Sequence, residues 1–188
     1  MSIYYVDGDN APKERIKGIE WLSENDEVYI FYADTNTYYT KDKNRRDIEL
    51  TTKAKIQFEK TGTGKNATDF AIAVHAAMAL EAAEEESLFL VSGDKHFIAI
   101  GTFLKRFSVK KFSVKCVDVI WKGIVDNYEQ IDNIEIIESI LKEKFGNDEG
   151  KKLYFVMQEL LYQKFQREEG NRKTKWNIID RLKRMAFF

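Results

Sequence analysis

The stretch IYYVDGDN at residues 3–10 joins an apolar run of strand length to an acidic turn. Similar apolar runs follow at residues 28–33, 54–58, 87–91 and 112–117. Segments with the apolar spacing of helices lie between several of them, at residues 12–23, 67–84 and 97–104. Parallel strands need such crossover helices and bury both faces. The sequence therefore predicts a three-layer α/β fold, with a central, mostly parallel sheet of about five strands.

The remaining segments predict a loop and a helical appendage. Residues 35–47 are polar and without clear period, which indicates a loop leading into a short helix. After Asn127 the strand patterns stop, and helical patterns follow at residues 134–145, 152–167 and 177–185. We therefore expect two parts, an α/β domain at residues 1–128 and a small helical region at residues 129–188.

Composition narrows the classes of protein to consider. The chain has 188 residues, of which 44% are hydrophobic and 32% charged, so it can bury a globular core. Cys116 is the only cysteine, which excludes an intramolecular disulfide and a cysteine-based zinc site. A single cysteine fits a reducing compartment, and we expect a cytoplasmic protein. No apolar stretch is long enough to span a bilayer, so no membrane partner is expected.

Charge gives a local indication of a nucleic-acid partner. The formal net charge is −1, so overall charge does not argue for nucleic acid. Lysine and arginine are nevertheless concentrated in residues 105–115 and again after Gly150. A positive face that grips phosphates and an ordinary solvated surface both remain open for these two segments.

Three short segments carry polar side chains where such a sheet places its site. They are residues 6–10, residues 62–69 and residues 92–96, and each follows a predicted strand. Open parallel sheets bind ligands beyond the carboxyl ends of their strands. Aspartates gathered there repel one another unless a cation compensates their charge. Because oxygen ligands suit Mg²⁺ or Mn²⁺, these segments predict a divalent metal site.

Other interpretations of the same segments stay open. Residues 62–65 resemble part of a phosphate-binding loop, but Glu59 and Asn66 stand where that motif needs glycine and serine or threonine. Asp7 and Asp9 also match the nucleophile and acid/base of haloacid dehalogenase-type phosphatases. Each aspartate alone is, in addition, a residue type that caps helices.

Together the three segments resemble the motifs of PIN-like nucleases, including the related NYN domains. Residues 6–10 (VDGDN) are similar to a pattern Val-Asp-x-x-Asn, and residues 64–70 (GKNATDF) to Gly-Lys-Asn-Ala-x-Asp-Phe. Residues 92–97 (SGDKHF) are similar to Ser-x-Asp-Lys-x-Phe. The resemblance covers about residues 2–120, and its middle motif is the most specific.

The resemblance implies roles for individual residues. Asp7, Asp69 and Asp94 would be the catalytic metal ligands, and Asp9 a possible additional ligand. Substrate would be bound by Asn10, Lys65, Asn66, Ser92 and Lys95. His96 departs from the pattern, because many members carry a further carboxylate there. By position alone, Asp34, Asp47 and Glu49 are candidates for another acidic ligand.

We therefore expect a Mg²⁺- or Mn²⁺-dependent endoribonuclease that hydrolyses phosphodiester bonds of single-stranded or structured RNA. DNA as a substrate is not excluded. A haloacid dehalogenase-like phosphatase and a degenerate PIN-like interaction module are the alternatives. A homodimer or an inhibitory partner protein is compatible with any of these.

Overall fold

A computed structural model describes residues 1–82, 87–107 and 113–128. The whole chain divides into two units, Met1–Asn127 and Tyr128–Phe188. The helices predicted at residues 134–145, 152–167 and 177–185 lie outside the described residues.

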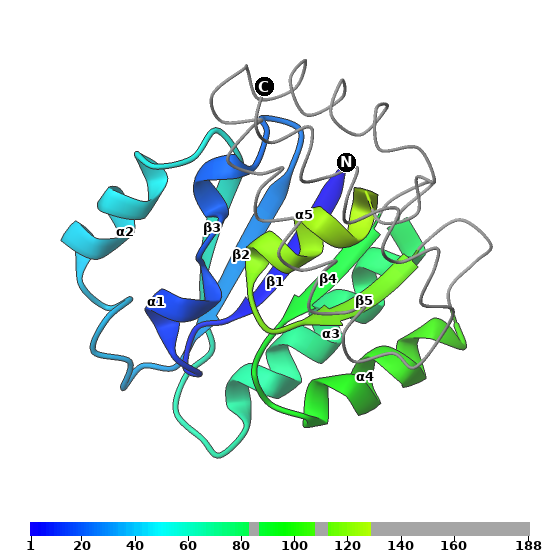
Figure 1. Cartoon of the computed structure of the whole chain (residues 1–188). Coiled ribbons are helices and arrows are strands. Elements are labelled where there is room, and N and C mark those ends of the chain that lie inside the picture. Colours follow the sequence, from blue (N-terminus) through cyan, green and yellow to red (C-terminus); the bar gives the residue numbers. More distant parts are fainter. Residues whose placement is uncertain (83–86, 108–112, 129–188) are drawn as a thin grey trace, which may run out of the picture. The chain divides into compact units, whose positions relative to one another are not determined.

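Five strands form one all-parallel sheet in the order β3-β2-β1-β4-β5 (Figure 1). Their bounds are β1 Ser2–Asp7, β2 Glu27–Tyr32, β3 Lys55–Lys60, β4 Ser87–Val91 and β5 Ser113–Val117. β1 lies at the centre and pairs with both β2 and β4, for example through Tyr5 with Tyr29 and with Leu90. The predicted α/β class and strand number are confirmed, and the sheet is parallel throughout.

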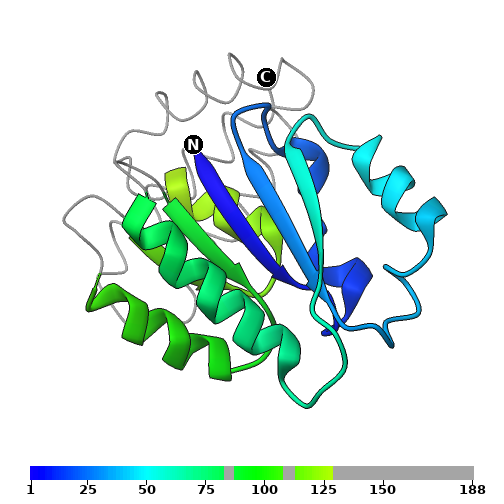
Figure 2. The ribbon, with the colours of Figure 1, turned by 180° about the vertical axis from the view of Figure 1, so that it is seen from behind.

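Helices cover both faces of the sheet and complete the three layers. They are α1 Pro12–Arg15, the 3₁₀ helix η1 Ile19–Trp21, α2 Asp42–Glu49, α3 Ala67–Ala82, α4 His96–Lys105 and α5 Ile120–Tyr128. α1 and α5 lie in front of the sheet in Figure 1, whereas α3 and α4 lie side by side on the opposite face in Figure 2. No helix among the described residues has the length and apolarity that a membrane crossing requires.

The first crossover differs from the single helix predicted for residues 12–23. α1 ends at Arg15, and Gly18 follows with φ +91°, which breaks the helix before η1. A Cβ at Gly18 would lie 2.5 Å from the Cβ of Trp121. The Trp121 amide also donates to the carbonyl of Lys17, at 3.1 Å. Close packing on Trp121 therefore replaces the middle of the predicted helix.

Alternate residues of β1 supply two hydrophobic layers. Tyr5 belongs to the cluster under α3 and α4 that includes Phe31 and Ile72. Tyr4 points to the other face, where its ring stacks on that of Phe89 with the ring centroids 4.9 Å apart. This period of two is what a strand buried on both faces requires. β1 is thus anchored on both sides, and its carboxyl end is held firmly.

Candidate functional site

The strand order reverses at β1, because β2 lies on one side of it and β4 on the other. In open α/β sheets such a reversal leaves a crevice at the carboxyl ends of the central strands. Asp7 is the last residue of β1, and Ser92 and Asp94 directly follow β4. Asp69 lies in the first turn of α3, the helix that crosses from β3 to β4. All three predicted motifs therefore reach the same end of the sheet.

Asp7 is a buried carboxylate, with 4% of its surface exposed. Ser92 Oγ donates a hydrogen bond to its Oδ2 at 2.7 Å, and the Asp9 amide donates to its Oδ1 at 3.2 Å. Burial raises the pKa of Asp7, and the neighbouring charges of Asp69 and Asp9 raise it further, against the lowering effect of the hydrogen bonds. The fold thus keeps the Asp7 carboxylate where burial and neighbouring charges disfavour its ionised form.

Asp69 and Asp94 extend this acidic group toward solvent. Burial raises the pKa of Asp69, and the charge of Asp94 adds to the rise, while His96 opposes it. Asp94 Oδ1 accepts a hydrogen bond from the His96 amide at 2.9 Å and lies 3.3 Å from His96 Nδ1. The charge of Asp69 therefore acts on Asp7, and the charge of Asp94 acts on Asp69, although the three residues are far apart in sequence.

Asp9, predicted as an additional metal ligand, has both carboxylate oxygens engaged. They accept hydrogen bonds from the Ala33 amide at 3.0 and 3.1 Å, from Asn36 Nδ2 at 2.7 Å and from Thr68 Oγ1 at 2.6 Å. These three donors occupy most of the roughly four lone-pair sites of a carboxylate. The role of Asp9 as a ligand stays a prediction, and its contacts give it a structural role between β2 and α3.

Two of the predicted substrate-binding residues are used inside the fold. Ser92 is 8% exposed; it donates to Asp7 and accepts the Asp94 amide at 3.1 Å. The Asn10 side-chain oxygen accepts from Arg15 Nη2 at 2.9 Å. Both residues therefore hold parts of the site, and contact with substrate stays a prediction for each.

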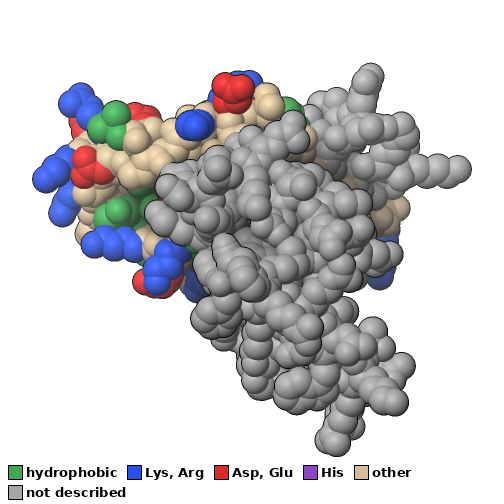
Figure 3. Space-filling model, turned by 45° about the horizontal axis from the view of Figure 1, so that its top comes forward, with side chains coloured by type: hydrophobic (Ala, Val, Ile, Leu, Met, Phe, Trp, Pro, Cys, Tyr) green, Lys and Arg blue, Asp and Glu red, His purple; other side chains and the backbone are tan. Residues whose placement is uncertain are grey.

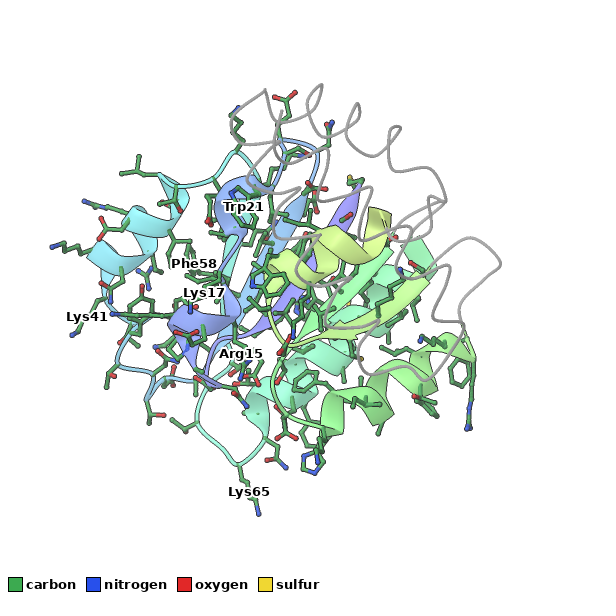
Figure 4. All side chains as sticks on the ribbon, viewed as in Figure 1. Arg15, Lys17, Trp21, Lys41, Phe58 and Lys65 are labelled. Atoms are coloured by element: carbon green, nitrogen blue, oxygen red, sulfur yellow. The ribbon has the colours of Figure 1, made fainter. Side chains whose placement is uncertain are left out.

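The other predicted substrate-binding residues are exposed. Lys65 and Asn66 lie in the loop before α3, and in Figure 4 the Lys65 side chain points outward from that loop. Asn66 has φ +64°, in the left-handed region that asparagine tolerates. Lys95 immediately precedes α4 and is also exposed. All three are accessible near the carboxyl ends of the strands.

A family model for the PIN domain matches residues 1–112. The chain belongs to the PIN domain family. PIN domains are generally nucleases, so this chain has a nuclease-type fold. Comparisons with curated proteins and with solved structures gave no match. The family resemblance inferred from the three motifs is thereby confirmed.

PIN domains typically use divalent metals, and the donor atoms of this one suit such an ion. Asp7, Asp69 and Asp94 offer only oxygen, which Mg²⁺ and Mn²⁺ accept, and a cation would relieve the repulsion that adds to the effect of burial on the pKa values of Asp7 and Asp69. Within residues 1–82, 87–107 and 113–128, however, no three such side chains are close enough together to hold an ion. An ion shared by the three aspartates would therefore require their side chains to move, and Asp69 and Asp94 are both partly exposed.

Among the further acidic candidates of this PIN domain, Asp34 follows β2 and the other two lie on α2. Asp34 pairs with Lys60 at 2.8 Å. Asp47 and Glu49 are exposed on α2, beside β3 at the edge of the sheet, two strands from β1 (Figure 1). Position in the sequence suggested these residues as ligands, but the strand order separates α2 from the site.

Charged side chains of both signs lie on the edge of the sheet where α2 is. Lys and Arg side chains at the left of Figure 3, the side on which α2 lies in Figure 1, stand among Asp and Glu side chains. α2 itself carries Lys43, Arg45 and Arg46 together with Asp42, Asp47 and Glu49. Arg45 is bound inward, to Tyr32 Oη and to the Tyr39 carbonyl. The exposed lysine and arginine are therefore the ones available to an anionic partner.

Sequence reasoning missed two residues that organise the site. Thr68 falls at a variable position of the middle motif, yet its hydroxyl binds Asp9 and lies 3.0 Å from Thr61 Oγ1. Arg15 lies within the predicted first helix and binds loops on two other parts of the chain. Only the position of Thr68 next to Asp69 could have drawn attention to it.

Proposed function

We propose that this PIN domain is a metal-dependent endoribonuclease, with Asp7, Asp69 and Asp94 as ligands of Mg²⁺ or Mn²⁺. The observation that carries the proposal is the gathering of these aspartates at the strand-order reversal, where burial raises the pKa values of Asp7 and Asp69 and the neighbouring negative charges add to the rise. Uncompensated charge in a crevice is costly for stability and is typical of sites that bind a cation. Membership of a family of nucleases supports the same conclusion.

The ion, when bound, supplies Lewis-acid activation and charge neutralisation for phosphodiester hydrolysis. The protein residues prepare that site. Ser92 orients the Asp7 carboxylate and, through its oxygen, the backbone of Asp94. Lys65 and Lys95 are exposed cations that would neutralise substrate phosphates on either side of the cleavage point. Asn10 and Asn66 would contact the same nucleic-acid strand from the loops that follow β1 and β3.

RNA is the proposed substrate class, on the strength of the motif resemblance, with DNA as the competing polymer. The exposed lysines near the strand ends, Lys65 and Lys95, favour a polyanion over a small phosphate ester. Cytoplasmic location, and restraint by a second copy or an inhibitory protein, stay predictions.

The test is cleavage of single-stranded RNA with Mn²⁺ or Mg²⁺ by the wild-type chain and by Asp69→Asn. Loss of a ligand should slow cleavage at least roughly 10- to 100-fold, which is the typical effect of replacing a residue that only supports a ligand. Asp47→Asn is the matched control, since it makes the same change on exposed α2. Equal cleavage by wild type and Asp69→Asn would refute the ligand assignment.

Two further substrates separate the alternatives in the same assay. Hydrolysis of a small phosphate monoester, with RNA left intact, would support a phosphatase with Asp7 as nucleophile and Asp9 as acid/base. Cleavage of single-stranded DNA at the rate of RNA would broaden the substrate class. RNA binding without cleavage in Mn²⁺ would support a degenerate interaction module, which the separation of the acidic side chains favours.

A further inference from the structure

Arg15, the last residue of α1, binds loops from two different parts of the chain (Figure 4). Its Nε donates to the Asn10 carbonyl at 3.0 Å, and its Nη2 donates to the Asn10 side-chain oxygen at 2.9 Å. Its Nη1 donates to the Asp118 carbonyl at 2.7 Å, 103 residues further along the chain. One guanidinium therefore joins the loop after β1 to the loop after β5.

The same guanidinium lies against the loop after β4. A Cβ built on Gly93 would be 2.1 Å from Arg15 Nη2 and 2.7 Å from its Cζ. Gly93 is thus the residue that lets the guanidinium approach, because any side chain there would displace it. Gly93 lies between Ser92 and Asp94, so the loop that carries Asp94 rests on Arg15. The loops after β1, β4 and β5 meet on this side chain.

The contacts use the geometry of arginine as well as its charge. A guanidinium is planar and directs its donors in a fixed fork, whereas a lysine ammonium is a single point on a flexible stem. Two parallel donors grip Asn10, and the third fixes the turn at Asp118. Among the described residues, no carboxylate lies within ion-pair distance of Arg15. Its hydrogen bonds go to neutral oxygens of the loops that it joins.

We propose that Arg15 is a positioning residue, which sets the distance between the Asn10 loop and the Asp94 loop and so fixes the position from which the Asp94 side chain reaches an ion shared with Asp69 and Asp7. This inference rests on the proposed metal site. Residues that orient metal ligands commonly change affinity by about 10- to 100-fold when replaced. Arg15 would therefore act on the metal without touching it.

The test compares Arg15→Lys and Arg15→Ala with wild type in two measurements. Calorimetry gives Mn²⁺ affinity, and NMR gives the backbone amide signals of Asn10, Gly93 and Asp94 in metal-free protein. Both variants should weaken Mn²⁺ binding by about tenfold or more and shift these amides. Lys17→Ala is the control: Lys17 is a neighbouring exposed cation, paired with Glu14 at 2.5 Å, and should change neither measurement.

The outcomes separate this proposal from the proposed function. Wild-type protein that binds no Mn²⁺ and cuts no RNA would refute the metal-dependent nuclease, and the positioning role toward the metal would fall with it. Wild-type protein that binds Mn²⁺, with Arg15→Lys of equal affinity, would overturn the role of Arg15 alone. If Arg15→Ala does not fold, Arg15→Lys still decides, since it keeps the charge and the alkyl stem.

Discussion

Ser92 Oγ donates a 2.7 Å hydrogen bond to Asp7 Oδ2 across the β1–β4 pair, between residues 85 positions apart. The bond lowers the pKa of Asp7 against the effect of burial. Ser92→Ala should therefore raise the pKa of Asp7 further, and Mn²⁺ binding, which needs the ionised carboxylate, should shift to higher pH. At a fixed neutral pH we expect about tenfold weaker binding. Calorimetric titration with Mn²⁺ across a series of pH values measures both effects.

Ser87→Ala provides the control for this change. Ser87 begins β4 and accepts a hydrogen bond from Ser113 Oγ at 2.9 Å, at the opposite end of the sheet from Asp7. Ser87→Ala therefore removes the same kind of hydroxyl as Ser92→Ala, but at the other end of β4. A similar pH shift in both variants would contradict a specific link between Ser92 and Asp7.

Asp7→Asn should stabilise the metal-free protein at neutral pH while abolishing its response to metal. The pKa values of Asp7 and Asp69 are raised above 3.8 in the folded state. The folded protein then binds more protons than the unfolded chain, so stability falls as pH rises from 3.8 through the raised values. Replacing Asp7 removes the contribution of its own carboxylate to that loss of stability. Thermal unfolding in chelator should give a higher Tm for Asp7→Asn at pH 7 and a flatter dependence on pH.

Mn²⁺ should reverse the order of the Tm values of wild type and Asp7→Asn. In the proposed site Mn²⁺ binds the ionised carboxylates of the folded state, so it should raise the Tm of wild type and have little effect on Asp7→Asn. Asp26→Asn is the contrast: Asp26 is buried but accepts bonds from the Ser2 amide and from the amide and hydroxyl of Ser23. That variant should lose about 1–3 kcal/mol of stability. A lower metal-free Tm for Asp7→Asn as well would show that Asp7 serves structure.

The sequence alone predicted the fold because its signals are local. Apolar runs such as residues 87–91 are short and buried on both faces, which only a covered parallel sheet accommodates. It also placed Asp7, Asp69 and Asp94 at the same end of the sheet, because parallel strands share their carboxyl edge. The extent of the first helix was mispredicted, since the break at Gly18 depends on Trp121, more than 100 residues away.

The supporting contacts of the site were beyond sequence reasoning for the same reason. Arg15 and Asp9 make these contacts because the strand order brings particular loops together. No residue spacing in the sequence indicates which loops meet. Asp9 illustrates the limit. Its residue type and position suit a ligand, and only the donors from Ala33, Asn36 and Thr68 reveal another use for its carboxylate.

Thr68→Val should test that structural role of Asp9. The substitution keeps the shape of the buried side chain but removes the donor to Asp9 Oδ2 and the contact with Thr61. We expect a loss of about 1 kcal/mol in stability and weaker Mn²⁺ binding, because the first turn of α3 carries Asp69. Thr68→Ser, which retains the hydroxyl, should behave like wild type. Urea unfolding and calorimetry measure the two effects.

The double variant Thr68→Val with Asp9→Asn distinguishes a holding residue from a ligand. If Asp9 acts through Thr68, the two changes share one interaction and their combined effect on Mn²⁺ affinity will be smaller than the sum. A ligand role predicts that Asp9→Asn alone removes binding and that Thr68→Val alone has little effect. That second pattern would restore Asp9 to the ligand set.

Gly8→Ala should disrupt the site through the backbone between Asp7 and Asp9. A Cβ there would lie 2.6 Å from the Phe31 carbonyl oxygen and 2.8 Å from Cε2 of Tyr39, and the Gly8 amide donates to that same carbonyl at 2.8 Å. Tyr39 is buried and cannot retreat. We expect a loss of about 1–3 kcal/mol in stability, the usual cost of overpacking, together with loss of cleavage.

Gly64→Ala is the matched control, because it makes the same change in another of the predicted motifs. A Cβ at Gly64 would meet only the Cβ of Ala67, at an ordinary 3.8 Å. Its stability should therefore stay close to that of wild type in urea unfolding. Comparable losses of stability in the two variants would mean that the loss in Gly8→Ala does not come from the close approach of Gly8 to β2. A stable but inactive Gly8→Ala would instead separate the geometry of the site from the stability of the fold.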